Sequence, residues 1–293
     1  MRHALAAVPA TALILCSLAG CGDSSGSSNT GPPAELTASV GAVARDEADA
    51  ALNALTLPTL LTPIGAGDGS ACASPSSTAD GDGDGIPDDA TWIFTAPPCR
   101  FSGYRGGTLD LVGQLRIQDP TPTAAGFGYE ATIIALRAAF TPQNAGDAYS
   151  TTRNGTRSLA GSVAGLQLTA NLQAIRTFTG LSDAAIDEQW TVQFAPETPL
   201  QINKPLPSGT LAAAGTFGWS RGTESIDLTL STPTPLHYNA SCTDDSRRID
   251  AGELHAAGTF AGTFAGTFAG TTGHVRVRWT ACGKNPEITF VAD

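Results

Sequence analysis

Basic residues are few in this chain, and charged residues of either sign are sparse. The 293 residues include 16 Lys and Arg against 27 Asp and Glu, which gives a formal net charge of -11. Because a protein that neutralises a nucleic-acid backbone needs a basic surface, we expect no nucleic-acid partner. Charged residues make up 15% of the chain, yet 41% of the residues are hydrophobic, too many for a disordered acidic polymer. We therefore expect a folded chain with a substantial core.

Residues and motifs that commonly carry catalysis are also scarce. The chain has four His, no Cys-x-x-Cys pair, no phosphate-binding glycine loop and no dinucleotide-binding fingerprint. Residues 218–222 (GWSRG) match the letters of a hydrolase nucleophile elbow, but an elbow joins a strand to a helix, and residues 223–231 have the pattern of a strand. By chain order alone, a triad with Ser220 could draw on His237, His255, His274, Asp227 and Asp250. We predict that the protein is not an enzyme, with no catalytic residues and no organic cofactor.

No apolar run long enough to span a membrane as a helix follows the first twenty residues. Met1-Arg2-His3 is a short positive start, residues 4–18 are apolar or small, and Leu18-Ala19-Gly20-Cys21 ends the segment. This pattern predicts a signal peptide over residues 1–20. The segment resembles a bacterial lipoprotein precursor, and its last four residues resemble a lipobox. The resemblance implies that Cys21 becomes the mature N-terminus and carries the lipid; the alternative is an ordinary secretory signal in which Cys21 is incidental.

Residues 21–34 predict the lipidated Cys followed by a flexible tether, because Gly, Ser and Pro dominate this segment. In lipoproteins an Asp directly after the lipidated Cys favours the inner membrane, and here Gly22 takes that place. The resemblance therefore implies a lipid anchor in the cell envelope, at the outer membrane. Whether the protein faces the periplasm or the exterior is left open.

Four cysteines remain once Cys16 leaves with the signal peptide and Cys21 takes the lipid. An even number in an exported chain predicts disulfides rather than a zinc site. Of the three possible pairings we favour the one that closes the shorter loops, Cys72 with Cys99 and Cys242 with Cys282.

A change of hydrophobic period divides the rest of the chain. An Ala-rich stretch predicts a helix over residues 35–57, which Pro58 ends. From residue 91 onward apolar residues alternate with polar ones, as in half-buried antiparallel strands. The clearest segments are 109–117, 166–172, 190–194, 226–230, 275–279 and 288–290. The prediction is an all-β fold over residues 91–293, an antiparallel meander forming a sandwich or small barrel, with one short N-terminal helix.

Three segments allow more precise or competing interpretations. Residues 129–140 could form a strand or a helix by period. Asn154-Gly155 predicts a tight hairpin turn, since both residues tolerate positive φ. Residues 258–271 repeat Gly-Thr-Phe-Ala, which is consistent with a long core strand, a ligand-lining aromatic stripe or a duplication that lengthens a hairpin.

An acidic run at residues 80–91 is the sharpest local signal. Carboxylates at alternate positions, with a Gly at the sixth, can surround one calcium ion with oxygen ligands. The run resembles the calcium loops of thrombospondin type 3 repeats and of EF-hand-like proteins. The resemblance implies a metal site formed by Asp80, Asp82, Asp84, the carbonyl of Ile86, Asp88 and Thr91. Thr91 stands where the family has a bidentate acid, and Asp89 could replace it.

The alternative for this run is a solvated acidic loop. Because five acids within ten residues repel one another unless a cation neutralises them, we expect calcium as a structural cofactor. The ion would rigidify the clamped loop between Cys72 and Cys99.

Two functional classes fit these observations. The first is a non-enzymatic, lipid-anchored envelope lipoprotein whose calcium-stabilised β domain acts as a binding or structural module. The second is a periplasmic or outer-membrane carrier of an apolar ligand such as a lipid, held in a barrel or half-barrel lined by Leu, Phe and Trp. The membrane is a partner through Cys21 in both, while a protein, glycan or apolar ligand is left open.

Overall fold

The computed structural model describes residues 34–55, 73–104, 107–142, 148–178, 182–242, 248–261 and 273–292. The predicted signal peptide, Cys21 with its tether, Cys72 and the centre of the Gly-Thr-Phe-Ala repeat lie outside these ranges. Within the described ranges, no helix is long and apolar enough to cross a membrane.

One helix and eleven strands follow one another along the chain. The helix, α1, spans Ala34–Ala54, close to the predicted range. The strands are β1 (Asp89–Tyr104), β2 (Gly107–Gln118), β3 (Tyr129–Pro142), β4 (Tyr149–Ser162), β5 (Gly165–Phe178), β6 (Ala184–Pro196), β7 (Gly209–Arg221), β8 (Glu224–Tyr238), β9 (Ile249–Ala261), β10 (Gly273–Trp279) and β11 (Glu287–Ala292).

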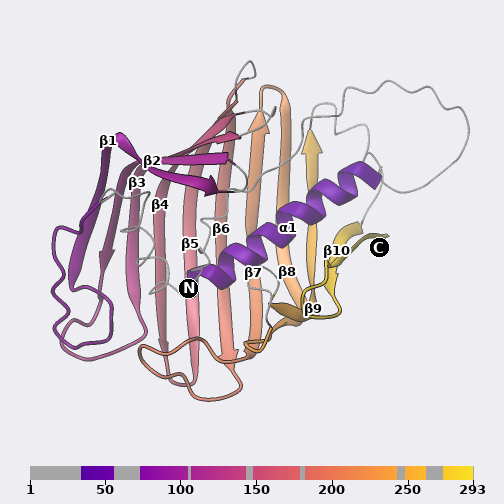
Figure 1. Ribbon diagram of the computed structural model, residues 1–293. Helices are drawn as coiled ribbons and strands as arrows, with labels where there is room; N and C mark the ends of the chain where they lie inside the picture. The colour runs from indigo at the N-terminus through magenta and orange to yellow at the C-terminus, as the bar shows by residue number, and fades with distance from the viewer. Residues whose placement is uncertain are drawn as a thin grey trace, which may run out of the picture.

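The strands form a single sheet in which each strand pairs antiparallel with the next along the chain, from β1 to β11. The predicted all-β meander with one N-terminal helix is therefore confirmed. The described strands make one sheet that is not closed into a barrel, since β1 and β11 at its ends do not pair. Figure 1 shows the sheet curling around α1, which lies across one face.

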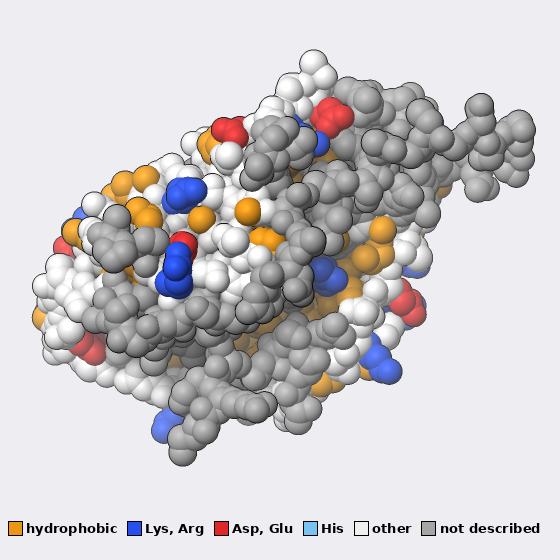
Figure 2. Space-filling model, turned by 45° about the horizontal axis from the view of Figure 1, so that its top comes forward, with side chains coloured by type: hydrophobic (Ala, Val, Ile, Leu, Met, Phe, Trp, Pro, Cys, Tyr) orange, Lys and Arg blue, Asp and Glu red, His pale blue; other side chains and the backbone are white. Residues whose placement is uncertain are grey.

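Alternation along the strands separates a buried face from an exposed one. In β5, Leu168 and Leu172 are buried whereas Thr169 is exposed. In β6, Val192 is buried whereas Gln189 is exposed. The buried positions of the strands join the buried side of α1 in one hydrophobic cluster, so we call this the inner face and the opposite one the outer face. Figure 2 shows that charged side chains lie scattered singly among apolar and neutral ones on the surface in view.

Bulges in the first strands help to bend the sheet. The pairing register shifts at Gly113 in β2 and again between Ile133 and Leu136 in β3. Ala135, at the second bulge, has a φ of 47°, and its N–H donates to the side-chain oxygen of Asn154 at 2.8 Å. Since a bulge bends its strand and increases the local twist, these shifts favour a curled layer over a flat one.

The hairpin prediction at Asn154-Gly155 was wrong. Both residues lie inside β4, and the turn between β4 and β5 falls at residues 163–164 instead. Asn154 serves the bulge of β3, and Gly155 has a φ of 133° and no room for a side chain, because a Cβ there would lie 2.2 Å from the carbonyl oxygen of Asn171. Gly155 therefore does have a positive φ, but it has it inside a strand rather than in a turn.

Two other sequence segments have clear outcomes, and a third lies mostly outside the described residues. Residues 129–140 form strand β3 rather than a helix. Residues 218–222 end β7 and enter a tight turn into β8, so the elbow-like letters lie in a strand-turn-strand unit. The repeat begins inside β9, and residues 262–272 lie outside the described part of the chain.

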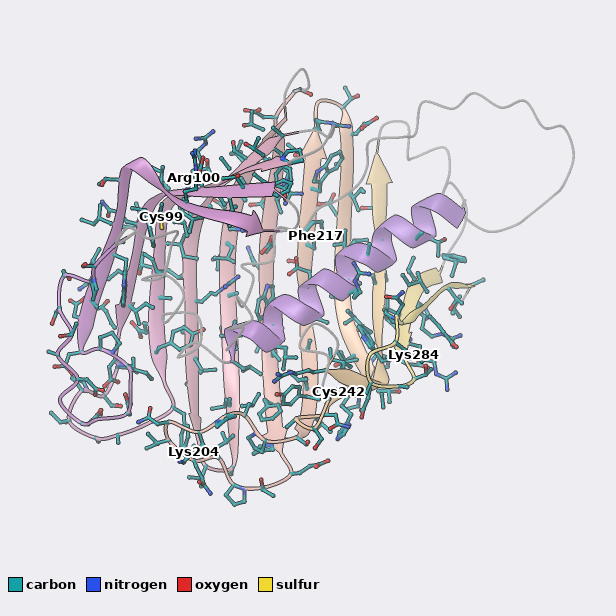
Figure 3. All side chains as sticks on the ribbon, viewed as in Figure 1. Cys99, Arg100, Lys204, Phe217, Cys242 and Lys284 are labelled. Carbon is teal, nitrogen blue, oxygen red and sulfur yellow. A yellow bond between two sulfur atoms is a disulfide. The ribbon has the colours of Figure 1, made fainter. Side chains whose placement is uncertain are left out.

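Cys242 and Cys282 form a disulfide, as predicted. Cys99 is buried and also disulfide-bonded, but Cys72 lies outside the described residues, so its pairing stays a prediction. Figure 3 shows Cys99 and Cys242 on opposite sides of the molecule. The two disulfides therefore lie far apart in the fold.

Candidate functional site

The acidic loop lies beside the end of β2, just before β1 begins. The N–H of Asp88 donates to the carbonyl of Ala79 at 2.8 Å, which closes the loop at its base. The N–H of Asp119, which directly follows β2, donates to the carbonyls of Pro87 and Asp88 at 3.2 Å each. The loop is thus attached to the sheet by backbone hydrogen bonds.

Carboxylates organise the backbone inside the loop. Asp80 accepts hydrogen bonds from the N–H groups of Gly83 at 2.8 Å and Gly85 at 3.0 Å. Asp88 accepts one from the N–H of Gly81 at 2.9 Å. Gly83 and Gly85 have φ values of 75° and 88°, which favour glycine. The glycines that separate the acids therefore let the chain turn tightly around them.

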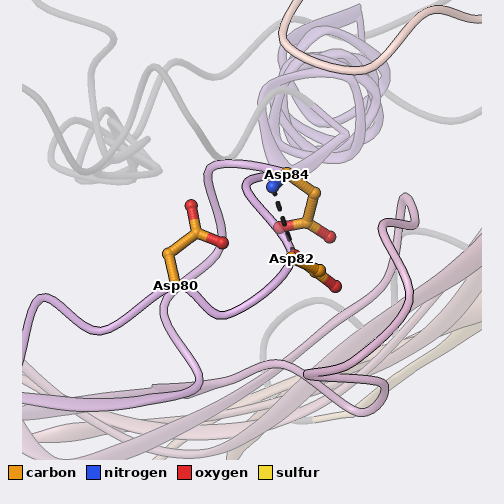
Figure 4. Close-up of side chains that lie close together, drawn as sticks. All are labelled: Asp80, Asp82 and Asp84. Atoms are coloured by element: carbon orange, nitrogen blue, oxygen red, sulfur yellow. Dashed lines mark hydrogen bonds between the residues drawn. The ribbon is translucent and has the colours of Figure 1, made fainter.

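Three carboxylates of the loop converge. Asp80, Asp82 and Asp84 each place an oxygen within 4.8 Å of the other two (Figure 4). Asp84 is 3% exposed, and its two oxygens accept hydrogen bonds from the N–H of Ile86 at 2.8 Å and of Gly126 at 3.0 Å. Asp82 accepts a hydrogen bond from the N–H of Asp84 at 3.2 Å. This geometry gathers oxygen ligands of one charge in a small volume.

A fourth carboxylate, which is buried, lies beside the base of the loop. Asp119 is 6% exposed, and one of its oxygens, Oδ1, accepts a hydrogen bond from the N–H of Thr121 at 2.8 Å. Its other oxygen, Oδ2, is buried and has no hydrogen-bond partner among the described residues, and the same is true of Oδ2 of Asp82. Loss of surrounding water raises the pKa of Asp82 above its usual value, and the charges of Asp84 and Asp119 raise it further. Two buried carboxylate oxygens therefore lack a positive or hydrogen-bonding partner.

The structure places the predicted ligands unequally. It brings Asp80, Asp82 and Asp84 together, while Asp88 binds the backbone of Gly81. Thr91 lies on β1, where its N–H donates to the hydroxyl of Ser76 at 3.0 Å, and Ile86 is buried. The roles of all six residues as ligands remain predictions.

Asp89 does not serve as the spare acid of the loop. Its carboxylate pairs with the guanidinium of Arg116 on β2, with Nε at 2.8 Å from Oδ1. The hydrogen bond to Arg116 lowers the pKa of Asp89 below its usual value. An acid already neutralised by an arginine is a poor ligand for a second cation.

The inner face of the sheet is the second candidate site. It is mainly apolar, and the four tryptophans of the chain are buried there, at Trp92 in β1, Trp190 in β6, Trp219 in β7 and Trp279 in β10. The indole N–H of Trp190 has no hydrogen-bond partner among the described residues. This face offers a large apolar surface with few polar groups, which suits an apolar ligand.

Charged side chains interrupt the inner face in one region. Glu47 of α1, Arg153 of β4 and Glu188 of β6 are buried. Arg176 of β5 is 2% exposed, and its Nε donates to the hydroxyl of Thr151 at 3.1 Å. Burial lowers the pKa of Arg157, which the negative charges of Glu188 and Glu47 partly offset. Three arginines and two glutamates therefore meet the apolar core in this region.

The residues that could form a hydrolase triad are not assembled. Ser220 ends β7, whereas His237 pairs with Thr210 at the start of the same strand. Ten residues of strand correspond to about 33 Å. His237 instead lies between Asp250, at 2.6 Å, and Glu197, at 2.9 Å. This separation removes the support that chain order gave to a Ser220–His237–Asp250 triad.

No family model, curated protein or solved structure matches this chain. The proposals on function below therefore rest on the sequence and structure of this chain.

The outer face carries a shallow groove of about 400 Å³ over β6 to β9. Gly218 leaves a gap between Asp187 and Asp227 on the neighbouring strands, and the rest of the lining combines threonines with Gln189, Phe217, Leu228 and Gly258. The groove is polar and holds no nucleophile paired with a base, which gives it no catalytic arrangement.

Asp119 is the site residue that sequence reasoning missed. It lies 28 positions beyond Thr91 and follows a strand rather than the acidic run. Only the pairing of β1 with β2 brings the end of β2 back to the loop. The sequence signal is a single acid after a strand, which has no distinctive spacing.

Proposed function

We propose that the protein is a non-enzymatic, lipid-anchored binding protein of a bacterial cell envelope, and that the inner face of its sheet holds an apolar ligand such as a lipid. The anchor rests on the lipobox resemblance of Leu18-Ala19-Gly20-Cys21. Attachment at the outer membrane rests on Gly22. The ligand class rests on the shape and chemistry of the sheet.

The width of the sheet relative to its helix carries the ligand proposal. A helix of 21 residues is about 30 Å long and about 10 Å wide. Eleven strands spaced about 4.8 Å apart form a layer about 50 Å across. Among the described elements, α1 packs mainly against β9, β10 and β11. The helix is thus narrower than the inner face, although its C-terminal end also reaches β3 through the hydrogen bond from Tyr129 to Ala54.

The side chains of the inner face support the same conclusion. Trp190 and Trp219 lie on the central strands β6 and β7, away from the strands against which α1 mainly packs. Tryptophan offers a broad apolar surface with one polar edge. The unpartnered N–H of Trp190 can donate to an oxygen of an ester or carboxyl group at the end of an acyl chain.

A structural module without a ligand is the second candidate. The buried side chains of α1 and of the inner face form one hydrophobic cluster, and such a cluster can be filled by the chain itself. The two candidates differ in whether an acyl chain can reach the inner-face tryptophans.

Quenching of tryptophan fluorescence by a brominated fatty acid tests the proposal on the full chain in detergent. Bromine on the acyl chain quenches an indole only on contact, so a bound fatty acid should produce saturable quenching. Replacing Trp190 by Phe should reduce the quenched fraction, while Trp279→Phe, on a strand covered by α1, should raise it, because that change removes emission that the fatty acid does not quench.

Iodide provides the control for access by water. Quenching by brominated fatty acid without quenching by iodide supports an acyl chain in the inner face. Absence of saturable quenching by the brominated fatty acid would sink the ligand proposal and leave the structural module.

A further inference from the structure

The backbone hydrogen bonds of the acidic loop do not reach every buried carboxylate oxygen in and beside it. The backbone N–H groups of the loop satisfy oxygens of Asp80, Asp84 and Asp88. Oδ2 of Asp82 and Oδ2 of Asp119 remain buried without a partner among the described residues. Buried charges are normally paired or bound to a metal ion, so these two oxygens point to a cation between the loop and the end of β2.

We propose that a calcium ion binds between the loop and the sheet, with Asp80, Asp82, Asp84 and Asp119 as ligands. Asp119, from the end of β2, supplies the closing carboxylate in place of the acid that Thr91 lacks. This inference is independent of the apolar ligand of the inner face.

The donor set selects the type of metal. All four side chains offer carboxylate oxygen. Asp80, Asp82 and Asp84 converge without a His or Cys among them, and Asp119 lies beside the loop, where its N–H donates to the carbonyls of Pro87 and Asp88. Oxygen donors suit calcium and magnesium, whereas zinc prefers nitrogen and sulfur. Calcium accepts six to eight oxygens in irregular geometry, while magnesium demands near-ideal octahedral geometry and keeps several waters. Three convergent carboxylates, with Asp119 beside the loop as a fourth, therefore fit calcium better.

The loop that would hold the ion already contacts two connections between strands. Asp84 of the loop accepts the N–H of Gly126, in the connection between β2 and β3. The side-chain amide of Asn203, in the connection between β6 and β7, donates to the carbonyl of Gly83 at 3.0 Å. With Asp119 as a ligand, the loop would be held to the end of β2 by an ionic bond as well. Calcium would therefore stabilise this edge of the sheet and not the loop alone.

Isothermal titration calorimetry on the full chain, freed of metal by a chelator, tests the proposal. The parent chain should bind one calcium ion, and Asp119→Asn should weaken that binding about tenfold or more, because it removes one charged ligand. Asp187→Asn is the matched control, since Asp187 is an exposed acid on the outer face of β6. Its calcium affinity should equal that of the parent. Magnesium at the same concentrations should not reproduce the calcium binding.

Thermal unfolding distinguishes whether Asp119 binds the calcium ion or only stabilises the fold. In chelator, Asp119→Asn should be as stable as the parent or more stable, since it removes an unpaired buried charge. In calcium, it should be less stable than the parent, because the parent alone gains the full binding energy. This reversal also shows that the variant folds.

Two results would overturn the proposal. Absence of calcium binding to the parent would remove the ion, and an Asp119→Asn variant with unchanged affinity would remove Asp119 as a ligand. Neither result bears on the quenching experiment, so failure of the metal site and failure of the apolar-ligand proposal are distinguishable.

Discussion

The hydroxyl of Tyr129 donates a hydrogen bond of 2.8 Å to the backbone carbonyl of Ala54. Ala54 is the last residue of α1, and Tyr129 lies on β3 with 1% of its surface exposed. The last carbonyls of a helix have no partner within the helix, so Tyr129 satisfies one of them. This contact attaches the end of α1 to a strand far across the sheet from β11, against which Gly41 of the same helix packs. The helix is therefore held near both ends.

Replacing Tyr129 by Phe should lower the free energy of unfolding at neutral pH by about 1–2 kcal/mol, because a buried carbonyl loses its donor. Urea unfolding of the full chain measures the change. Tyr149→Phe is the control, since the ring that packs near Arg176 and Phe140 is retained.

The difference between the parent and Tyr129→Phe should shrink in alkali. Burial raises the pKa of Tyr129 from 10.0 to about 12. The folded chain therefore keeps this proton where the unfolded chain has lost it, so the stability from this group is complete below pH 10 and falls as the pH rises toward 12. The loss approaches about 2 kcal/mol by linkage. A difference that stays constant from pH 8 to pH 11 would contradict the buried hydrogen bond.

Periodicity carried most of the fold prediction. Alternating segments such as residues 166–172 and 226–230 became strands whose apolar positions are buried, because the pattern of one wet and one dry face is local. The curl of the sheet was not predictable in the same way. It depends on bulges such as the one at Ala135, whose partner Asn154 lies 19 positions away.

The candidate site was only half visible in the sequence. The alternating acids Asp80, Asp82 and Asp84 are neighbours in the chain, and their convergence follows from glycines between them. Asp119 joins them through strand pairing, which a single sequence does not specify at the level of one residue. The sequence likewise allowed Asp89 as a ligand, because it does not show which residue of the neighbouring strand Asp89 meets. In the structure that residue is Arg116 of β2.

His237 should stabilise the fold in acid rather than in alkali. Its ring bonds Asp250 and Glu197, and the hydrogen bond to Asp250, followed by that to Glu197, raises the pKa of His237. A raised pKa means that the folded state binds the proton more tightly. The contribution is therefore complete below the usual His pKa of 6.5 and is lost as the pH rises through the folded value.

Replacing His237 by Gln should cost about 1 kcal/mol or less near pH 5.5, because the side chain is 29% exposed and water screens the ion pairs. The cost should diminish by about pH 9. His255→Gln serves as a control of opposite sign, since burial and the nearby charge of His274 lower the pKa of His255. Chemical unfolding at both pH values measures both variants, and a cost at His237 that grows with pH would contradict the assignment.

Gly41 lies in α1 directly against Ile288 of β11. A Cβ at position 41 would come within 2.3 Å of Cγ2 of Ile288. In an exposed helix, Gly→Ala stabilises by about 1 kcal/mol. Here the added methyl group must push Ile288 aside, so Gly41→Ala should instead destabilise the chain by about 1–3 kcal/mol.

A double-mutant cycle with Ile288→Ala distinguishes a clash from a general defect of the helix. Ile288→Ala alone should destabilise, because it removes apolar surface that packs on the core. In that background the space beside position 41 is open, so Gly41→Ala should become stabilising through helix propensity. The two changes should therefore show a favourable coupling of about 1–3 kcal/mol in urea unfolding. Additive effects, or a stabilising Gly41→Ala in the parent chain, would mean that α1 does not pack on β11 through this glycine.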